Sequence, residues 1–183
     1  ELGALNLEAT LEGDRVDAQF SLPWLRGRFQ QEPLSLQEGM AEQADQLLNR
    51  QLAVALLDLD GLPDMTDQWV DTAPPTPDEA LPQWPPLAVQ VSEIYRTHNA
   101  LGDLALVVDY DQSDGWEFRD ISGDFLGIKW LPSTRIGWRI APEGQETSLS
   151  LAAELSDIGE SLALIGVAPL VETRGGSLKA DWR

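Results

Sequence analysis

The sequence predicts a mainly β protein in which a curved, mostly antiparallel sheet forms a half-pipe or groove, with one or two short helices. Three observations support this fold class. Apolar residues alternate with polar or small ones through most of the chain, as they do over residues 104–110, and a side-chain period of two is that of a strand. Turn sequences such as Asp114-Gly115 separate the alternating segments. Few segments show the period of a helix.

The first part of the chain, residues 1–70, is predicted to form one β lobe. Its clearest element is a hairpin over residues 4–22, where two alternating segments flank a glycine-containing turn. Residues 24–36 are interpreted as a further pair of short strands, broken at Gly27 and at Pro33. After a segment with helical spacing, the alternation resumes at Leu52, Val54 and Leu56, which form the last predicted strand of this lobe.

A second lobe is predicted over residues 87–183, with five or six strands in meander order. An acidic, proline-rich segment, 71–86, precedes it and is interpreted as an exposed linker or insertion. Proline cannot donate a ladder hydrogen bond, so this segment does not suit a central strand. Within the second lobe, Gly123 and Gly127 are expected to mark bulges or bends.

Two segments have the spacing of a short helix. Apolar residues recur at helical spacing over 38–50, which predicts a short amphipathic helix or an ordered loop. A second helix is predicted over about 157–166, because Ser156 can cap its N-terminus and an apolar stripe follows. These are the helices that the predicted fold includes.

Composition excludes several classes of function. The formal charge is −19, and a field of that sign repels phosphate backbones, so nucleic acid is not an expected partner. The chain has no cysteine, which excludes disulfides and Cys–Zn sites. No apolar run is long enough to span a bilayer. Both ends fall inside alternating patterns, so we expect the chain to be a fragment of a longer β-rich protein.

Acidic residues suggest one candidate metal site, which the sequence does not favour. A possible calcium loop places oxygen-bearing side chains at its first, third, fifth and twelfth positions, namely Asp109, Asp111, Ser113 and Asp120. Such a loop requires glycine at its sixth position, where this chain has Asp114. We therefore interpret the segment as an acidic hairpin turn, and no metal site is predicted.

No catalytic constellation is predicted either. His98 is the only histidine and lies in a turn sequence, without a recognisable nucleophile or orienting partner. Two carboxylates would suffice for glycoside hydrolysis, and the seven tryptophans could stack on sugars, but three tryptophans alternate in phase with aliphatic residues and are better interpreted as apolar interior. We therefore expect a protein that is not an enzyme and that uses no cofactor.

Two pairs of arginines allow two interpretations. Arg26 and Arg28 flank a glycine, and Arg135 and Arg139 flank Trp138. Either pair could hold a phosphate headgroup at the edge of a groove. We favour the simpler interpretation, in which each arginine pairs with one of the many acidic residues on a neighbouring strand.

The order of motifs in the second lobe resembles the AsmA-like region of YhdP-type envelope proteins. The resemblance covers residues 86–183, and the first 70 residues are similar only in the style of their strands. Its motifs are Pro86-Leu87 with Val89, Val91 and Ile94; Leu101-Gly102 with Leu104 and Leu106; Gly115-Trp116 with Phe118 and Ile121; Asp157-Ile158-Gly159 with Leu162 and Ile165-Gly166; and Gly175-Gly176 with Leu178, Ala180 and Trp182.

This resemblance implies a segment of a large protein that is anchored in the inner membrane of a Gram-negative bacterium and extends through the periplasm. It implies a repeating sheet with an apolar interior that carries phospholipids between the inner and outer membranes and so supports outer-membrane integrity. The implied partners are phospholipid acyl chains and the remaining segments of the same long chain, with membrane contact made by other parts of the protein. The alternative is a non-catalytic β-scaffold or adhesion module of the cell envelope.

If the sheet is a conduit, the apolar residues of alternating segments should share one face and remain partly open to a groove. Glu117, Arg139 and Ser150 should then lie on the opposite face. The candidate groove residues are Leu104, Leu106, Val108, Trp116, Phe118, Ile136, Trp138, Leu149 and Leu151.

Overall fold

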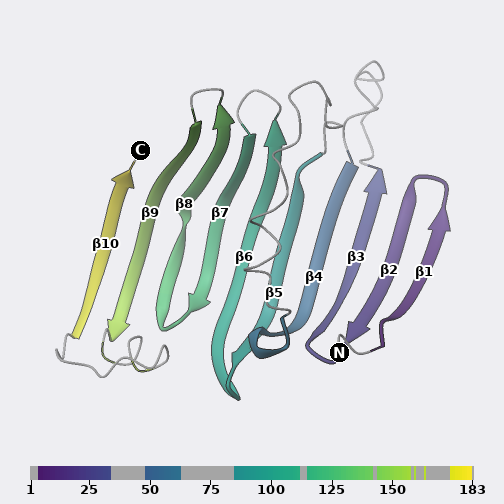
Figure 1. Ribbon diagram of the computed structural model, residues 1–183, viewed down its shortest axis with the longest axis horizontal. Helices are drawn as coiled ribbons and strands as arrows, with labels where there is room; N and C mark the ends of the chain where they lie inside the picture. The colour runs from purple at the N-terminus through teal and green to yellow at the C-terminus, as the bar shows by residue number, and fades with distance from the viewer. Residues whose placement is uncertain are drawn as a thin grey trace.

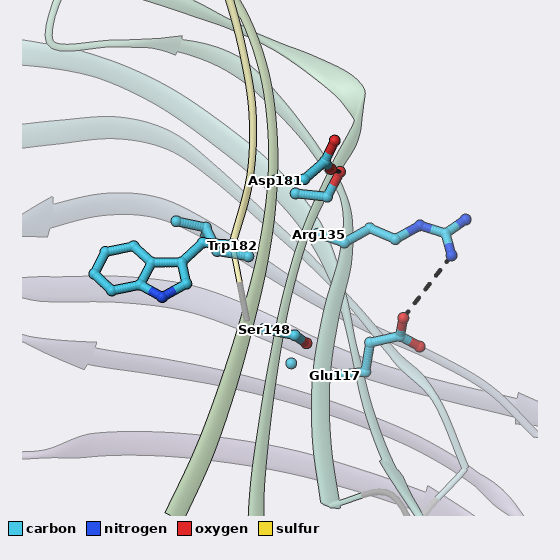
Figure 2. Close-up of a pocket in the computed structure, with 8 residues that line it drawn as sticks. Glu117, Arg135, Ser148, Asp181 and Trp182 are labelled. Atoms are coloured by element: carbon cyan, nitrogen blue, oxygen red, sulfur yellow. Dashed lines mark hydrogen bonds and ion pairs between the residues drawn. The ribbon is translucent and has the colours of Figure 1, made fainter.

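The computed structural model shows a single open sheet of ten strands in sequence order, β1 to β10 (Figure 1). It describes residues 4–33, 48–62, 85–111, 115–141, 144–157, 159, 163 and 174–182. The predicted fold class is confirmed, because the sheet is mostly antiparallel and does not close into a barrel. In Figure 2 the strands of the first lobe cross behind those of the second, which shows the twist of the sheet.

The strands lengthen from the N-terminal edge towards the second lobe, and one short 3-10 turn follows the fourth strand. The elements are β1 Asn6–Glu12, β2 Arg15–Leu22, β3 Leu25–Pro33, β4 Leu48–Asp58, η2 Leu59–Gly61, β5 Leu87–Arg96, β6 Asn99–Asp111, β7 Gly115–Phe125, β8 Ile128–Ala141, β9 Gly144–Asp157 and β10 Arg174–Trp182.

Eight of the nine strand pairings are antiparallel, and the exception joins the two halves of the sheet. Strands β4 and β5 run parallel, with Leu52 opposite Val89 and Val54 opposite Val91. A parallel pair cannot be joined by a tight turn and requires a crossover connection. The six strands β5 to β10 form the predicted meander.

Residues with positive φ angles mark the predicted turns and bulges. Gly13 turns the first hairpin, and Gly127 lies in the turn between β7 and β8. Gly123 has a φ of 132° and lies at a register shift in β7, as expected for a bulge. Thr97 and His98 form the turn between β5 and β6, and the carboxylate of Asp60 in η2 accepts a hydrogen bond from the backbone N–H of Thr97.

The prediction of two short strands over 24–36 is wrong, because one strand, β3, runs through Gly27 to Pro33. Gly27 is needed for close packing and does not end the strand. A Cβ atom at this position would lie 2.4 Å from Cζ of Phe20 and 2.8 Å from the carbonyl oxygen of Ala53. Pro33 is the last residue of the strand, where a missing N–H is tolerated.

The two predicted helices fall largely outside the described residues. Strand β4 begins at Leu48, so the last three residues of the range 38–50 are extended and that boundary was wrong. These residues are extended because they pair with β3, where Arg50 lies opposite Gln31. In the range 157–166, Asp157 ends β9, and only Gly159 and Ala163 beyond it are described, both helical. Most of the linker over 71–86 also lies outside the described residues.

Few residues are fully buried. The described residues contain six buried hydrophobic side chains, and four of them, Val54, Val91, Ile94 and Leu101, form one cluster where β4, β5 and β6 meet. Nearly all the other described side chains are partly or fully exposed. This is the pattern of a single sheet layer without a second layer packed on it.

Candidate functional site: the apolar face of the sheet

The strand register determines which side chains share a face, because directly opposite residues project to the same side. From β6 to β9 it places Val108 opposite Phe118, Phe118 opposite Ile136, and Ile136 opposite Leu149. The next step places Leu149 opposite Trp182 of β10. One row of large apolar side chains therefore crosses five strands.

All nine candidate groove residues lie on this same face. On β6, Leu104, Leu106 and Val108 follow one another at every second position. None of the nine is fully buried, and Trp116 is 37% exposed. Their contact with lipid stays a prediction, but the geometry leaves each of them accessible.

The face extends through the first lobe, which the candidate set did not include. The parallel pairing of β4 with β5 continues the face, with Leu52 opposite Val89, and the pairings of β3, β2 and β1 extend it to the N-terminal edge of the sheet. The alternation of apolar residues in the first hairpin could have predicted this part of the face. We call this whole surface the apolar face; its members in the first five strands are Leu7, Ala9, Leu11, Val16, Ala18, Phe20, Leu22, Leu25, Phe29, Leu52, Val54, Leu57, Leu87, Val89, Val91 and Ile94.

Exposure on the apolar face rises from the middle of the sheet to its edges. Val54 and Val91 in the middle are 6% and 7% exposed, whereas Leu11 on β1 and Trp182 on β10 are 71% and 74% exposed. A side chain within a sheet is shielded by neighbours on both flanking strands, and one at an edge by neighbours on one strand only. The gradient shows that no second layer of described residues covers the outer strands.

Aromatic side chains form a row across the apolar face at one end of β6, β7 and β8. Tyr110 lies opposite Trp116, and Trp116 lies opposite Trp138. The ring centroids of Tyr110 and Trp116 are 4.8 Å apart with the planes tilted by 51°. This distance is in the range of favourable aromatic pairs, and such rings add a large apolar area.

One polar residue is buried among these side chains. Thr134 is 1% exposed and lies opposite Ile121, next to a register shift in β8. Its Oγ1 donates to the carbonyl of Ala152 at 2.9 Å and accepts from the amide of Ala152 at 3.1 Å. The hydroxyl thus replaces ladder contacts that the irregular backbone does not supply, which explains a buried polar group here.

The opposite surface, which we call the polar face, carries most of the charged side chains. Arg50 is an exception: it lies in a row of the apolar face between Gln31 and Leu87, and its Nε donates a hydrogen bond to Gln31 at 2.8 Å. Figure 2 shows this division at the β10 edge: the ring of Trp182 projects to one side of the sheet, and Glu117 and Arg135 project to the other. Six ion pairs join neighbouring strands among the described residues, all on the polar face: Arg15–Glu32, Arg28–Asp17, Arg119–Asp109, Lys129–Glu154, Arg135–Glu117 and Arg139–Glu146.

These ion pairs account for most of the arginines that the sequence left open. Arg28 makes two hydrogen bonds with the carboxylate of Asp17, one of them from Nε at 2.7 Å. The hydrogen bonds from Arg28 hold the pKa of the Asp17 carboxyl below its ordinary value. Arg135 and Arg139 pair with acidic neighbours, and Arg26 is exposed without an ion pair to any described residue.

Hollows on the polar face lie over positions with small side chains. One of about 550 Å³ is bordered by Arg135, Asp181 and Glu117 and has Gly137 and serine side chains beneath it. The charged groups around it already have partners: Arg135 lies 4.0 Å from Glu117, and Asp181 accepts a hydrogen bond from Ser150 at 2.7 Å. The hollow is an open depression between this ion pair and this hydrogen bond.

The structure also describes His98 and part of the possible calcium loop. His98 is exposed in its turn, and Asp109 and Asp120 of the possible calcium loop both pair with Arg119. The described part of the chain contains no group of three or more His, Cys, Asp or Glu side chains that could hold a metal ion. It also contains no helix that is long and apolar enough to cross a membrane.

No family model, curated protein or solved structure matches this chain. The geometry of the sheet is therefore the basis on which its function must be argued.

Proposed function

We propose that this chain is a non-catalytic segment of a periplasmic conduit that carries phospholipids between the inner and outer membranes and supports outer-membrane integrity. The acyl chains would lie on the apolar face. The observation that carries this proposal is the strand register, which joins alternating residues of all ten strands into one continuous apolar surface. The resemblance of residues 86–183 to AsmA-like proteins supports the same role.

The dimensions of the apolar face suit an acyl chain. Ten strands span nine spacings of about 4.8 Å each, which gives a surface roughly 43 Å across. Each acyl CH₂ removed from water contributes about 0.8 kcal/mol, so a 16-carbon chain gains about 12 kcal/mol before ordering costs. Burial against this face is therefore strong enough to hold a lipid tail without a dedicated headgroup site.

The polar face has a complementary part in this proposal. Its ion pairs and the net charge of −19 keep the outer surface hydrated. An acidic exterior is repelled by anionic leaflets, which leaves membrane contact to other parts of the long chain. In this arrangement the protein is anchored to the inner membrane of a Gram-negative bacterium by segments beyond the sheet.

Site-specific photocrosslinking tests the proposal. A benzophenone amino acid at Phe118 or Trp138, on the apolar face, should capture phospholipid in cells, and one at Glu117 or Arg139 should not. Positions 117 and 118 form a matched pair, because they are neighbours on β7 that project to opposite faces. Mass spectrometry identifies the adduct.

Lipid extraction of the purified, detergent-free protein gives an independent measurement. Co-purified phospholipid is the expected result. Equal crosslinking from positions 117 and 118, or repeated absence of phospholipid in both experiments, would overturn the proposal and favour a scaffold or adhesion module.

A further inference from the structure

The apolar face carries a half-buried arginine within one of its rows. Arg50 of β4 lies opposite Gln31 of β3 and opposite Leu87 of β5, and Leu52 follows two positions further along β4. Its Nε donates a hydrogen bond to the side-chain oxygen of Gln31 at 2.8 Å, and this partner is neutral. A guanidinium has five N–H donors, so this hydrogen bond uses only one of them. Arg50 makes no ion pair with any described residue.

The surroundings of Arg50 differ from those of the paired arginines. On the polar face, Arg28, Arg135 and Arg139 each lie beside a carboxylate of a neighbouring strand. The residues opposite Arg50 on its own face are an amide and a leucine, and none of them is acidic. A charge without a counterion is costly in apolar surroundings. Arg50 is therefore suited to a ligand that brings a negative charge to an apolar surface.

The aromatic row lies at the same end of the apolar face as Arg50. The row that contains Arg50 passes through Val108 of β6. The row of Tyr110, Trp116 and Trp138 lies two positions further towards that end of the sheet. Phenol and indole groups combine an apolar ring with one polar group, and at membrane surfaces they lie at the depth of the lipid headgroups. This end of the face therefore has the chemistry of a boundary between headgroup and tail.

The opposite end of β4 is apolar and closely packed. Leu57 packs there against the buried cluster, whose members are at most 7% exposed. At about 3.3 Å per residue, the strand extends roughly 20 Å from Arg50 to Leu57. The hydrocarbon core of a bilayer is about 30 Å thick for two leaflets, or about 15 Å for each tail. A tail that begins at Arg50 therefore has enough length of β4 to lie against.

We propose that Arg50 binds the phosphate group of a phospholipid whose tails lie along the strands towards the buried cluster. This inference rests on the proposed function and adds to it an orientation and a preference. Burial of the tails supplies affinity without Arg50, and the arginine favours lipids that carry a phosphate. Its parallel N–H donors match the oxygens of a phosphate group. The aromatic row then lies beside the headgroup.

Two short-chain lipids with the same tails test the proposal. Dihexanoyl phosphatidylglycerol carries a phosphate and dihexanoylglycerol does not. Calorimetric titration of the protein, below the micelle concentration, should give the lower Kd for the phosphatidylglycerol. Arg50→Gln should raise that Kd about tenfold or more and leave the Kd for dihexanoylglycerol unchanged. Arg50→Lys keeps the charge but not the planar donors, so its loss of affinity should be smaller.

Arg26→Gln is the matched control. Arg26 also makes no ion pair with any described residue, but the register places it on the polar face, opposite Ser21 of β2. This variant should leave the Kd for both lipids unchanged, and circular dichroism checks that each variant folds. The NMR signal of the Nε–H of Arg50, assigned by its loss in Arg50→Lys, gives a direct readout. It should shift with the phosphatidylglycerol and not with dihexanoylglycerol.

The outcomes separate this inference from the proposed function. Equal Kd values for the two lipids, or an Arg50→Gln variant that binds the phosphatidylglycerol as wild type does, would overturn the headgroup contact and leave tail binding intact. A protein that binds neither lipid would overturn both proposals. If inorganic phosphate alone shifts the Nε–H signal at the same concentration as the phosphatidylglycerol, Arg50 binds free anions and the lipid assignment is wrong.

Discussion

The apolar and polar faces are made by the same ten strands, and yet they have opposite chemical character. On the apolar face the side chains are joined in rows of Leu, Val, Ile, Phe and Trp, with a buried cluster only where β4, β5 and β6 meet. On the polar face six ion pairs join neighbouring strands.

This difference shows that a shift of one residue along a strand moves a side chain from one chemical surface to the other. Backbone pairing and the buried cluster hold the layer together in water, while much of the apolar face stays accessible. In a two-layer protein that apolar area would be buried against the second layer. Substitutions at adjacent positions of one strand can therefore test the two faces against each other.

The largest effect is expected from a charge on the apolar face. Leu106→Asp places a carboxylate among apolar rows, where an unpaired polar group costs about 1–3 kcal/mol. We expect a several-fold loss of co-purified phospholipid, and thermal unfolding should show lower stability. The control is Val107→Asp, which lies on the polar face opposite Arg119. Equal loss of lipid in both variants would break the distinction between the faces.

A smaller effect is expected at Thr134, the one buried polar side chain among the described residues. Thr134→Val keeps the shape but removes both hydrogen bonds with Ala152, leaving buried backbone groups unsatisfied. The free energy of unfolding should fall by about 1–3 kcal/mol. Thr134→Ser retains the hydroxyl, so it should lower the free energy of unfolding by a smaller amount in the same denaturant titration. A valine variant as stable as wild type would contradict the role given to this hydroxyl.

On the polar face, removal of one ion pair should change little. Lys129 and Glu154 are 3.1 Å apart, and both side chains are more than half exposed. Lys129→Ala should therefore lower the free energy of unfolding by less than about 1 kcal/mol. The difference from wild type should shrink in high salt, because mobile ions screen exposed charges. A larger, salt-independent loss would mean that the polar face carries more of the stability than its exposure indicates.

The smallest effect concerns Asp17 and is a matter of pH. Arg28 lowers the pKa of this carboxyl from the ordinary 3.8. Because the native pKa is the lower one, the stabilisation is complete above 3.8 and is lost as the pH falls through the native value. In Arg28→Ala, NMR titration should show the pKa of Asp17 rising towards its ordinary value. An unchanged titration would mean that the hydrogen bonds to Arg28 do not hold it.

Local pattern was sufficient to predict the strands, the two faces and several irregular positions. The period of two placed Glu117 and Phe118 on opposite sides, and Gly123 was expected at a bulge. The error at Gly27 has a physical cause: in sequence a glycine inside a strand indicates a break, but here it admits the ring of Phe20 from the next strand. That close approach is a property of the assembled sheet.

Long-range pairing could not be predicted in the same way. Strands β4 and β5 pair in parallel although the residues between Asp58 and Leu87 separate them in the sequence. No local pattern indicates which strands pair across a connection of that length. The candidate site was for the same reason confined to the second lobe. The exposure gradient, too, depends on what covers each strand, which alternation does not specify.

The parallel joint has a consequence for how the chain folds. Each half of the sheet is a series of neighbouring pairings, and such local contacts form quickly. The β4–β5 pairing has the longest connection of all the strand pairs, from Asp58 to Leu87, and the entropy of closing that loop opposes its formation. The buried cluster of Val54, Val91, Ile94 and Leu101 lies at this joint, and Asp60 binds the Thr97 turn beside it. Folding should therefore begin independently in two halves, and their docking should be the slow, cooperative step.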